Sequence, residues 1–174
     1  MKIRKFPMKT PNTLSDDALV RSGRLCPYCK SGTRIMDSAL VYNGQSWGWV
    51  VTCAKWPSCD SYVGCHPRSQ RPLGRLADKE LRAAKSMAHE ALDRLWKPSG
   101  RRAKEWVQTR RREAYKWLAG ALGVRERHCH VGMFDVDMCR KVVEVCCEKL
   151  SEMRTAADRP VFASDGHVIS EVFA

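Results

Sequence analysis

The sequence predicts an α+β protein in which a small three-stranded β-unit is followed by a helical unit of about three helices. Three observations lead to this fold class. Two close pairs of cysteines enclose a stretch rich in β-branched and aromatic residues, which are typical of strands. Asn43-Gly44 interrupts that stretch with a dipeptide that favours a tight hairpin turn. Beyond residue 75, apolar side chains recur at the three- and four-residue spacing of amphipathic helices.

Composition and periodicity divide the chain into four segments: a basic N-terminal tail at 1–24, the β-unit at 25–67, the helical unit at 75–152, and a C-terminal tail or small hairpin at 153–174. The first segment contains prolines and shows little periodicity. Between the β-unit and the helical unit, residues 68–74 contain Pro72 and Gly74 and are expected to form a linker. In the last segment, Asp165-Gly166 favours a turn.

Strands are expected in the β-unit at 33–42 and 45–52, joined by the Asn43-Gly44 turn, with a third short strand at 61–63. The first helix of the helical unit begins near Asp78, a residue type that caps helix N-termini. It ends at 97–100, where a proline and a glycine occur.

The second helix ends at Gly123 and is either one helix or two pieces joined near Thr109. The third begins at about Asp135. Its apolar face is formed by Met138, Val142, Val145, Cys146 and Leu150.

The cysteines carry the clearest chemical pattern. The chain has nine of them, an odd number, and no segment typical of secretion, so a full set of disulfides is not expected. Two close pairs separated by a hairpin supply the four thiolates of a tetrahedral zinc site. A unit of about 40 residues also has too little apolar core to fold without such a staple. We therefore expect a zinc ribbon with one structural Zn²⁺ bound by Cys26, Cys29, Cys53 and Cys59.

Other uses of the cysteines are less favoured. A redox C-x-x-C pair requires a strand-to-helix setting, whereas this pair opens a hairpin, and four thiolates leave no open position for catalytic zinc. Cys65-His66 is an alternative to Cys59 if the register differs. A second metal site would use His128, Cys129, His130 and Cys139. The favoured interpretation of the cysteines in the last helix is that they are small buried side chains.

The cysteine segment resembles the C-terminal zinc ribbons of type IA topoisomerases. Those ribbons combine C-P-x-C, a hairpin, and C-x-x-[WYF]-P-x-C followed by an aromatic residue. The corresponding residues are Cys26-Pro27-Tyr28-Cys29 and Cys53-Ala54-Lys55-Trp56-Pro57-Ser58-Cys59, with Tyr62 beyond them. The resemblance covers about a quarter of the chain and implies single-stranded DNA binding. Nothing matches a topoisomerase catalytic domain, so strand passage is not implied.

A longer resemblance spans most of residues 25–147. It is carried by Cys26-Pro27-Tyr28-Cys29, Asp37-Ser38-Ala39, Val63-Gly64-Cys65-His66, Arg71-Pro72-Leu73-Gly74, Leu76-Ala77-Asp78, Ala114-Tyr115-Lys116-Trp117-Leu118-Ala119 and His130-Val131-Gly132-Met133-Phe134-Asp135. These segments are similar to an uncharacterised zinc-finger-containing family of bacteriophages and prophages. The resemblance implies a phage or mobile-element origin and one ribbon plus a helical unit, and it implies no activity.

Positive charge is concentrated in two parts of the chain. The formal net charge is +12. Residues 1–34 hold eight Lys and Arg against two acidic residues, and residues 97–127 hold ten against three. Residues 128–174 are instead acidic, with five basic residues against eight acidic ones. Local basic surfaces favour nucleic acid or another polyanion as a partner.

Single-stranded DNA is the expected partner, because aromatic side chains can stack on bases while basic side chains contact phosphates. Trp56 is expected to be the exposed aromatic residue of the β-unit. The expected nucleic-acid contacts are Arg24, Lys30, Arg34, Lys55, Trp56, Tyr62, Arg110, Arg111 and Arg112.

We expect a non-enzymatic DNA-binding accessory protein, since no nucleophile–base pair, carboxylate pair or phosphate-binding loop emerges. No small-molecule substrate is expected. An alternative function is a phage-type modulator that binds a host protein such as RNA polymerase, topoisomerase or a defence complex. The absence of a long apolar run and of a secretory segment predicts a cytoplasmic protein with no membrane partner.

Overall fold

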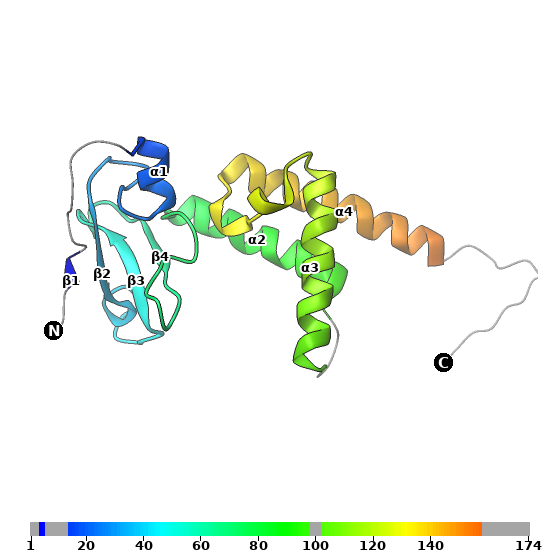
Figure 1. Cartoon of the computed structure of the whole chain (residues 1–174), viewed down its shortest axis with the longest axis horizontal. Helices are drawn as coiled ribbons and strands as arrows, with labels where there is room; N and C mark the ends of the chain where they lie inside the picture. Colours follow the sequence, from blue (N-terminus) through cyan, green and yellow to red (C-terminus); the bar gives the residue numbers. More distant parts are fainter. Residues whose placement is uncertain (1–3, 6–13, 98–101, 158–174) are drawn as a thin grey trace, which may run out of the picture.

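The computed structural model describes residues 4–5, 14–97 and 102–157. Its elements are, in order, β1 (Arg4–Lys5), α1 (Asp16–Arg21), β2 (Thr33–Asp37), the 3₁₀ turn η1 (Ser38–Leu40), β3 (Trp49–Cys53), β4 (Tyr62–Gly64), α2 (Lys79–Trp96), α3 (Lys104–Ala121), the 3₁₀ turns η2 (Glu126–His128) and η3 (Val131–Met133), and α4 (Val136–Ala157). Figure 1 shows the sheet at one end of the molecule and the three long helices beside it.

The strands form one antiparallel sheet in the order β1-β2-β3-β4. Ile35 lies opposite Val51, and Val51 lies opposite Val63. The expected three-stranded sheet followed by three helices is confirmed. The structure adds two elements in the segment expected to be a tail. β1 pairs with β2, and α1 is capped by the Ser15 side chain, which accepts a hydrogen bond from the Ala18 N–H.

The connection between β2 and β3 is longer than a two-residue hairpin. Asn43 and Gly44 have positive φ angles of 49° and 93°, so a turn does occur at the predicted dipeptide. However, β2 already ends at Asp37, whose side chain accepts a hydrogen bond of 2.8 Å from the Ala39 N–H and caps η1. Side-chain capping therefore ends the strand before the β-branched pattern does.

The segment expected to be a linker folds back onto the sheet. Cys65 forms an isolated bridge with Pro72, and the Leu73 N–H donates to the Gly64 carbonyl over 2.8 Å. Leu76 is fully buried in a small core with Ile35, Val51 and Cys65. Ala77 belongs instead to the core of the helices. The β-unit therefore extends to Leu76, and the helical unit begins at Ala77.

The helical unit follows the expected pattern closely. Asp78 caps α2 by accepting a hydrogen bond from the Leu81 N–H, and Asp135 does the same for α4 toward Met138. The second helix is a single one, α3, and Gly123 follows it with a left-handed φ of 65°.

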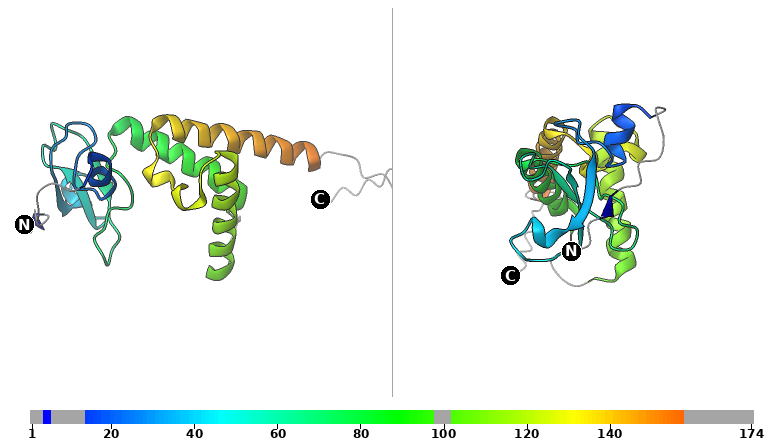
Figure 2. Two further views of the ribbon diagram at one scale, coloured as in Figure 1. Left: turned by 45° about the horizontal axis from the view of Figure 1, so that its top comes forward. Right: turned by 90° about the vertical axis from the view of Figure 1, so that its left-hand side faces the viewer.

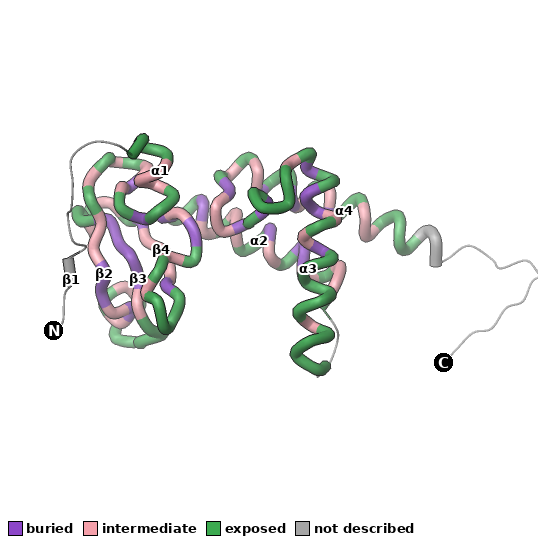
Figure 3. Tube along the Cα trace, viewed as in Figure 1, coloured by how far each residue is buried: buried purple, intermediate pink, exposed green. Residues whose placement is uncertain are grey.

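α2 packs along α4, and α3 crosses them (Figure 2). Buried residues gather on β3 and its neighbours and where the three helices meet, whereas the outer ends of α3 and α4 are exposed (Figure 3). None of the helices described is long and apolar enough to cross a membrane. The hairpin expected around Asp165-Gly166 lies outside the described residues.

Candidate metal centre

Two tight loops at one end of the sheet carry the four cysteines. In the first loop, the Cys26 N–H donates to the Ser31 carbonyl over 2.8 Å, and Lys30 takes a left-handed φ of 56°. In the second, the Trp56 N–H donates to the Cys53 carbonyl, and the Cys59 N–H donates to the Lys55 carbonyl. Because β2 and β3 are paired up to this end of the sheet, the two loops face each other.

The four sulfur atoms have the spacing of a tetrahedral metal site. The Sγ atoms of Cys26 and Cys59 are 3.7 Å apart, and those of Cys29 and Cys53 are 3.3 Å apart. All four lie within 4.8 Å of one another. Zn–S bonds of about 2.3 Å in a regular tetrahedron place sulfur atoms roughly 3.8 Å apart. Cys26, Cys29, Cys53 and Cys59 therefore fit one Zn²⁺ with no position left for water or substrate.

Polar groups around the sulfur atoms complete the site. The Ser61 hydroxyl lies 3.1 Å from Cys26 Sγ and 3.6 Å from Cys59 Sγ. The Lys55 N–H donates to Cys53 Sγ over 3.4 Å. Such hydrogen bonds orient thiolate ligands and spread their charge. Ser61 is fully buried. Its contact with the sulfur atoms was not predicted from the sequence, where its position two residues after Cys59 was the only indication.

The free thiols differ in acidity. Hydrogen bonds from Ser31, first from its side chain and then from its backbone, lower the pKa of Cys29 to about 6. Burial raises the pKa of Cys53 to about 12 and also raises the pKa of Cys59. Zinc binds thiolates, so loading the site at neutral pH releases protons, chiefly from Cys53 and Cys59.

The other cysteines do not assemble a second site. Within the described ranges, the cluster of Cys26, Cys29, Cys53 and Cys59 is the only group of three or more His, Cys, Asp or Glu side chains that could hold a metal ion. Cys65 lies in the core of the β-unit, and Cys129 and Cys139 lie in the core of the helical unit. The alternatives based on Cys65-His66 and on His128, Cys129, His130 and Cys139 are therefore not supported.

Basic residues surround the two cysteine loops. Arg24, Lys30 and Lys55 are exposed there. Lys30 makes a long ion pair of 3.8 Å with Asp16, in which both side chains are mostly exposed. Arg34 is half-buried, and its Nη2 donates to the Trp56 carbonyl over 3.1 Å. We refer to Arg24, Lys30 and Lys55 as the basic rim.

The exposed tryptophan of the β-unit is Trp47, not Trp56 as expected. Trp47 is 76% exposed, whereas Trp56 is half-buried. The strand expected at 45–52 begins only at Trp49, which pairs with the last residue of β2, so Trp47 remains in the connecting loop. Tyr62 is also not an open platform, since the Arg82 guanidinium lies 4.1 Å from its ring centroid and the Tyr42 ring lies at 5.8 Å.

The three consecutive arginines of α3 belong to the helical unit, not to the β-unit that holds the metal centre. Arg110, Arg111 and Arg112 are exposed. Arg110 lies over the Trp106 ring at 5.5 Å and pairs with Glu113, and Arg111 lies over the Tyr115 ring at 5.6 Å. The structure does not bring this run to the basic rim, because α3 lies across the helical unit from the sheet (Figure 1).

A family model, DUF3268, described as a zinc-finger-containing domain, matches residues 22–149. No curated protein and no solved structure matches the chain. The matched range contains all four cysteines and extends through α2 and α3 into α4, so it joins the β-unit and the helical unit in one domain. The chain therefore belongs to the DUF3268 family of zinc-finger-containing proteins.

Proposed function

We propose that this zinc-binding protein is a non-enzymatic accessory protein of phage or prophage type. It binds single-stranded or distorted DNA without strong sequence specificity. The observation that carries the proposal is the basic rim around a closed four-thiolate centre. The metal holds the two cysteine loops rigidly, and the loops present Arg24, Lys30 and Lys55 to solvent.

The closed centre favours a binding function over a catalytic one. A catalytic zinc ion keeps an open position for water or substrate, whereas four protein ligands fill the tetrahedral shell. In this proposal zinc supplies folding energy, and the protein surface supplies the contact.

The surface of the β-unit matches the needs of sequence-tolerant binding. Phosphate contacts come from the basic rim, and Trp47, in the β2–β3 connection at the opposite end of the sheet, offers a further exposed indole face for base stacking. The formal net charge of +12 adds long-range attraction to a polyanion.

The test is a binding series with the zinc-loaded full chain. Labelled single- and double-stranded oligonucleotides are titrated between about 50 and 200 mM salt, a range over which phosphate contacts weaken strongly. The variant Lys30→Ala/Lys55→Ala should lower the slope of log affinity against log salt by about 1.4 for single strands, or about 0.7 per lost contact. Lys141→Ala on α4 is the matched control, an exposed lysine of the helical unit that lies outside both cysteine loops. Equal slopes for the double variant and the control would show that the basic rim does not contact the phosphates.

A second candidate is a modulator that binds a host protein. The acidic C-terminal third favours it, because Glu144 and Glu148 of α4 are exposed and would repel DNA. If the zinc-loaded chain fails to bind any oligonucleotide, this candidate takes precedence. A purified host RNA polymerase or topoisomerase would then be tested directly for binding by calorimetry.

A further inference from the structure

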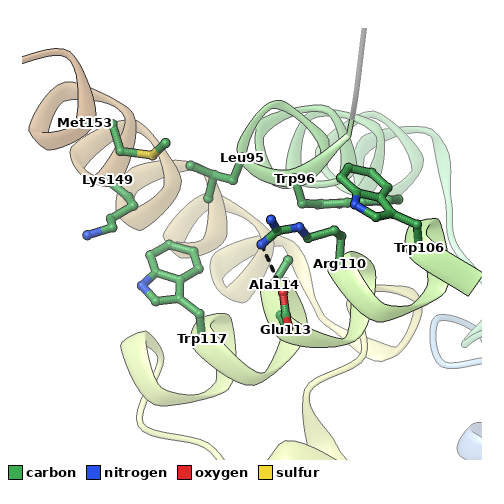
Figure 4. Close-up of a pocket in the computed structure, with 9 residues that line it drawn as sticks. All are labelled: Leu95, Trp96, Trp106, Arg110, Glu113, Ala114, Trp117, Lys149 and Met153. Atoms are coloured by element: carbon green, nitrogen blue, oxygen red, sulfur yellow. Dashed lines mark hydrogen bonds and ion pairs between the residues drawn. The ribbon is translucent and has the colours of Figure 1, made fainter. Parts of the chain in front are cut away.

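A groove of about 470 Å³ lies where the end of α2 meets α3 and α4. Three of the six tryptophans of the chain, Trp96, Trp106 and Trp117, line it. Leu95 adds to the apolar floor, Arg110 reaches in between Trp117 and Trp106, and Lys149 stands at one margin (Figure 4). We call this feature the tryptophan groove. It belongs wholly to the helical unit and takes no part in the metal centre.

The tryptophan groove exposes apolar side chains to solvent. Trp106 is 38% exposed, and Met153 at the same groove is 50% exposed. Apolar surface gathered in a concave site with polar margins is typical of a place where a partner binds. The volume lies within the range of about 300–1,000 Å³ found for ligand sites.

The charges at the groove favour an anionic partner. Arg110 lies over the Trp106 ring and pairs with Glu113 at 3.3 Å, and Lys149 pairs with Glu152 at 2.9 Å. These exposed ion pairs contribute little stability, so a phosphate can replace the carboxylate. Lys104, Arg112 and Lys116 of α3 are exposed as well. Residues 97–127 carry ten basic residues against three acidic ones, which makes the region complementary to a polyanion.

We infer that the tryptophan groove is a second contact for single-stranded nucleic acid. Bases stack against Trp106 and Trp117, Arg110 contacts the phosphate between them, and Lys149 contacts a phosphate beyond Trp117 (Figure 4). Flat aromatic surfaces alternating with cations match a strand in which bases alternate with phosphates. This inference rests on the proposed function and extends it to the helical unit.

The presence of two separate contacts makes the affinity depend on the length of the nucleic-acid strand. The basic rim and the groove lie in different units, so a short strand engages only one of them. A strand long enough to reach both gains effective concentration from the first contact, and its affinity rises steeply at that length.

The experiment uses the zinc-loaded full chain and labelled deoxythymidine oligonucleotides of increasing length. Trp106→Leu keeps an apolar side chain but removes the stacking surface, and it should weaken binding of long strands roughly 5- to 150-fold. Lys149→Ala should lower the salt slope by about 0.7 for a single strand. Lys141→Ala, an exposed lysine on the same helix outside the groove, should bind as the unmodified chain does. Circular dichroism of each variant confirms that the helices are retained.

The outcomes separate this inference from the proposed function. If both groove variants bind as the unmodified chain does while Lys30→Ala/Lys55→Ala loses affinity, the groove inference is overturned and the basic rim stands. If the groove variants lose affinity and the rim variant does not, the groove stands and the proposed role of the β-unit is overturned. An unmodified chain that binds no oligonucleotide overturns both. Tryptophan fluorescence that responds to an acidic amphipathic peptide but not to oligonucleotide would assign the groove to a protein partner instead.

Discussion

The β-unit and the helical unit are stabilised by different forces. Among the described residues, the largest apolar cluster of the β-unit consists of Ile35, Val51, Cys65 and Leu76, whereas that of the helical unit contains fifteen buried residues. Burial of apolar surface stabilises a domain roughly in proportion to the area removed from water. The helical unit can therefore rely on its apolar core, while the β-unit depends on the bonds between four thiolates and a metal ion.

This difference shows how a chain of modest length combines a metal-stabilised unit with a unit that has a conventional apolar core. The two units meet without a flexible connection, because Leu76 completes one core and Ala77 begins the other. Tyr62 and Ala77 exchange two backbone hydrogen bonds across the boundary, and Arg82 of α2 donates to the Asp60 carboxylate over 2.7 Å. Loss of one unit should therefore disturb the near end of the other and leave its far end intact.

Removal of the metal is expected to have the largest effect. Cys26→Ser should reduce bound zinc from one ion per chain to none and should unfold the β-unit, because thiolate–zinc binding contributes on the order of 10–16 kcal/mol in small finger domains. The helical signal of α2, α3 and α4 should remain largely intact. Metal analysis measures the first effect, and circular dichroism with amide hydrogen exchange at Ile35 and Val51 measures the second.

Cys147→Ser is the matched control for the metal prediction. Cys147 is exposed on α4 and lies outside the metal cluster, so this variant should keep one zinc ion and a protected sheet. Loss of most of the helical signal in Cys26→Ser would show that the two units fold as one. Retention of one tightly bound zinc ion would contradict the ligand set.

A complementary experiment destabilises the core of the helical unit and leaves the metal site unchanged. Leu118 is fully buried, and Leu118→Ala should lower the free energy of unfolding by about 2–5 kcal/mol through lost burial and the resulting cavity. Thermal melting followed at 222 nm should shift to lower temperature, while bound zinc stays at one ion per chain. Met87→Ala, at a position that is 59% exposed, is the control and should leave the melting temperature nearly unchanged. Loss of zinc from the folded Leu118→Ala protein would argue against separate stabilisation.

The metal site could be predicted because its ligands are arranged locally. Each cysteine pair closes a short loop, and a hairpin between the pairs needs no information from distant residues. The caps at Asp78 and Asp135 were also predictable, since a side chain that accepts from a nearby N–H marks a helix start within a few residues.

Features that depend on contacts between distant parts of the backbone could not be predicted from the sequence. β1 is only two residues long and is defined by its pairing with Ile35 and Arg34. The return of the chain at Pro72 rests on backbone hydrogen bonds to β4. Trp47 is exposed because β3 begins only at Trp49, which pairs with Asp37. The groove likewise joins residues of three helices whose crossing the periodicity of each helix does not determine.

The junction between the units offers a smaller perturbation. At Gly74 an added methyl group would meet the Gly132 carbonyl and lie 2.9 Å from its Cα, so Gly74→Ala must push these backbone segments apart. We expect a loss of about 1–3 kcal/mol in the free energy of unfolding, as for overpacked sites. Gly120→Ala is the matched control, because no atom lies within 4 Å of the added methyl and alanine favours helix by up to about 1 kcal/mol. Chemical denaturation of both variants checks the prediction, and a destabilised Gly120→Ala with an unaffected Gly74→Ala would contradict it.

The smallest expected effect is a dependence on pH at the same junction. The Lys85 ammonium on α2 donates to the Gly132 carbonyl over 2.7 Å and to the Arg75 carbonyl over 3.1 Å, so it holds the end of the β-unit against η3. The pKa of Lys85 is lowered to about 8, mainly by burial; the neighbouring Cys139 thiol acts in the opposite direction, and the nearby charge of Arg75 contributes to the lowering. Between the folded pKa and the ordinary value of 10.5, the unfolded chain binds a proton that the folded chain has lost. Stability must therefore rise with pH across this window.

Lys85→Met removes this titration and keeps a side chain of similar length. The unmodified chain should gain stability relative to Lys85→Met as pH rises from about 8 to about 10.5, by less than about 2 kcal/mol because solvent still reaches part of the group. The difference should be constant below pH 8, where Lys85 is protonated in both states. Denaturation of the two zinc-loaded proteins at matched pH values measures it, since groups that Lys85 does not influence cancel. A difference that falls with pH would mean that the ammonium stabilises the junction more than its burial destabilises it, and that charge, rather than packing, joins the two units.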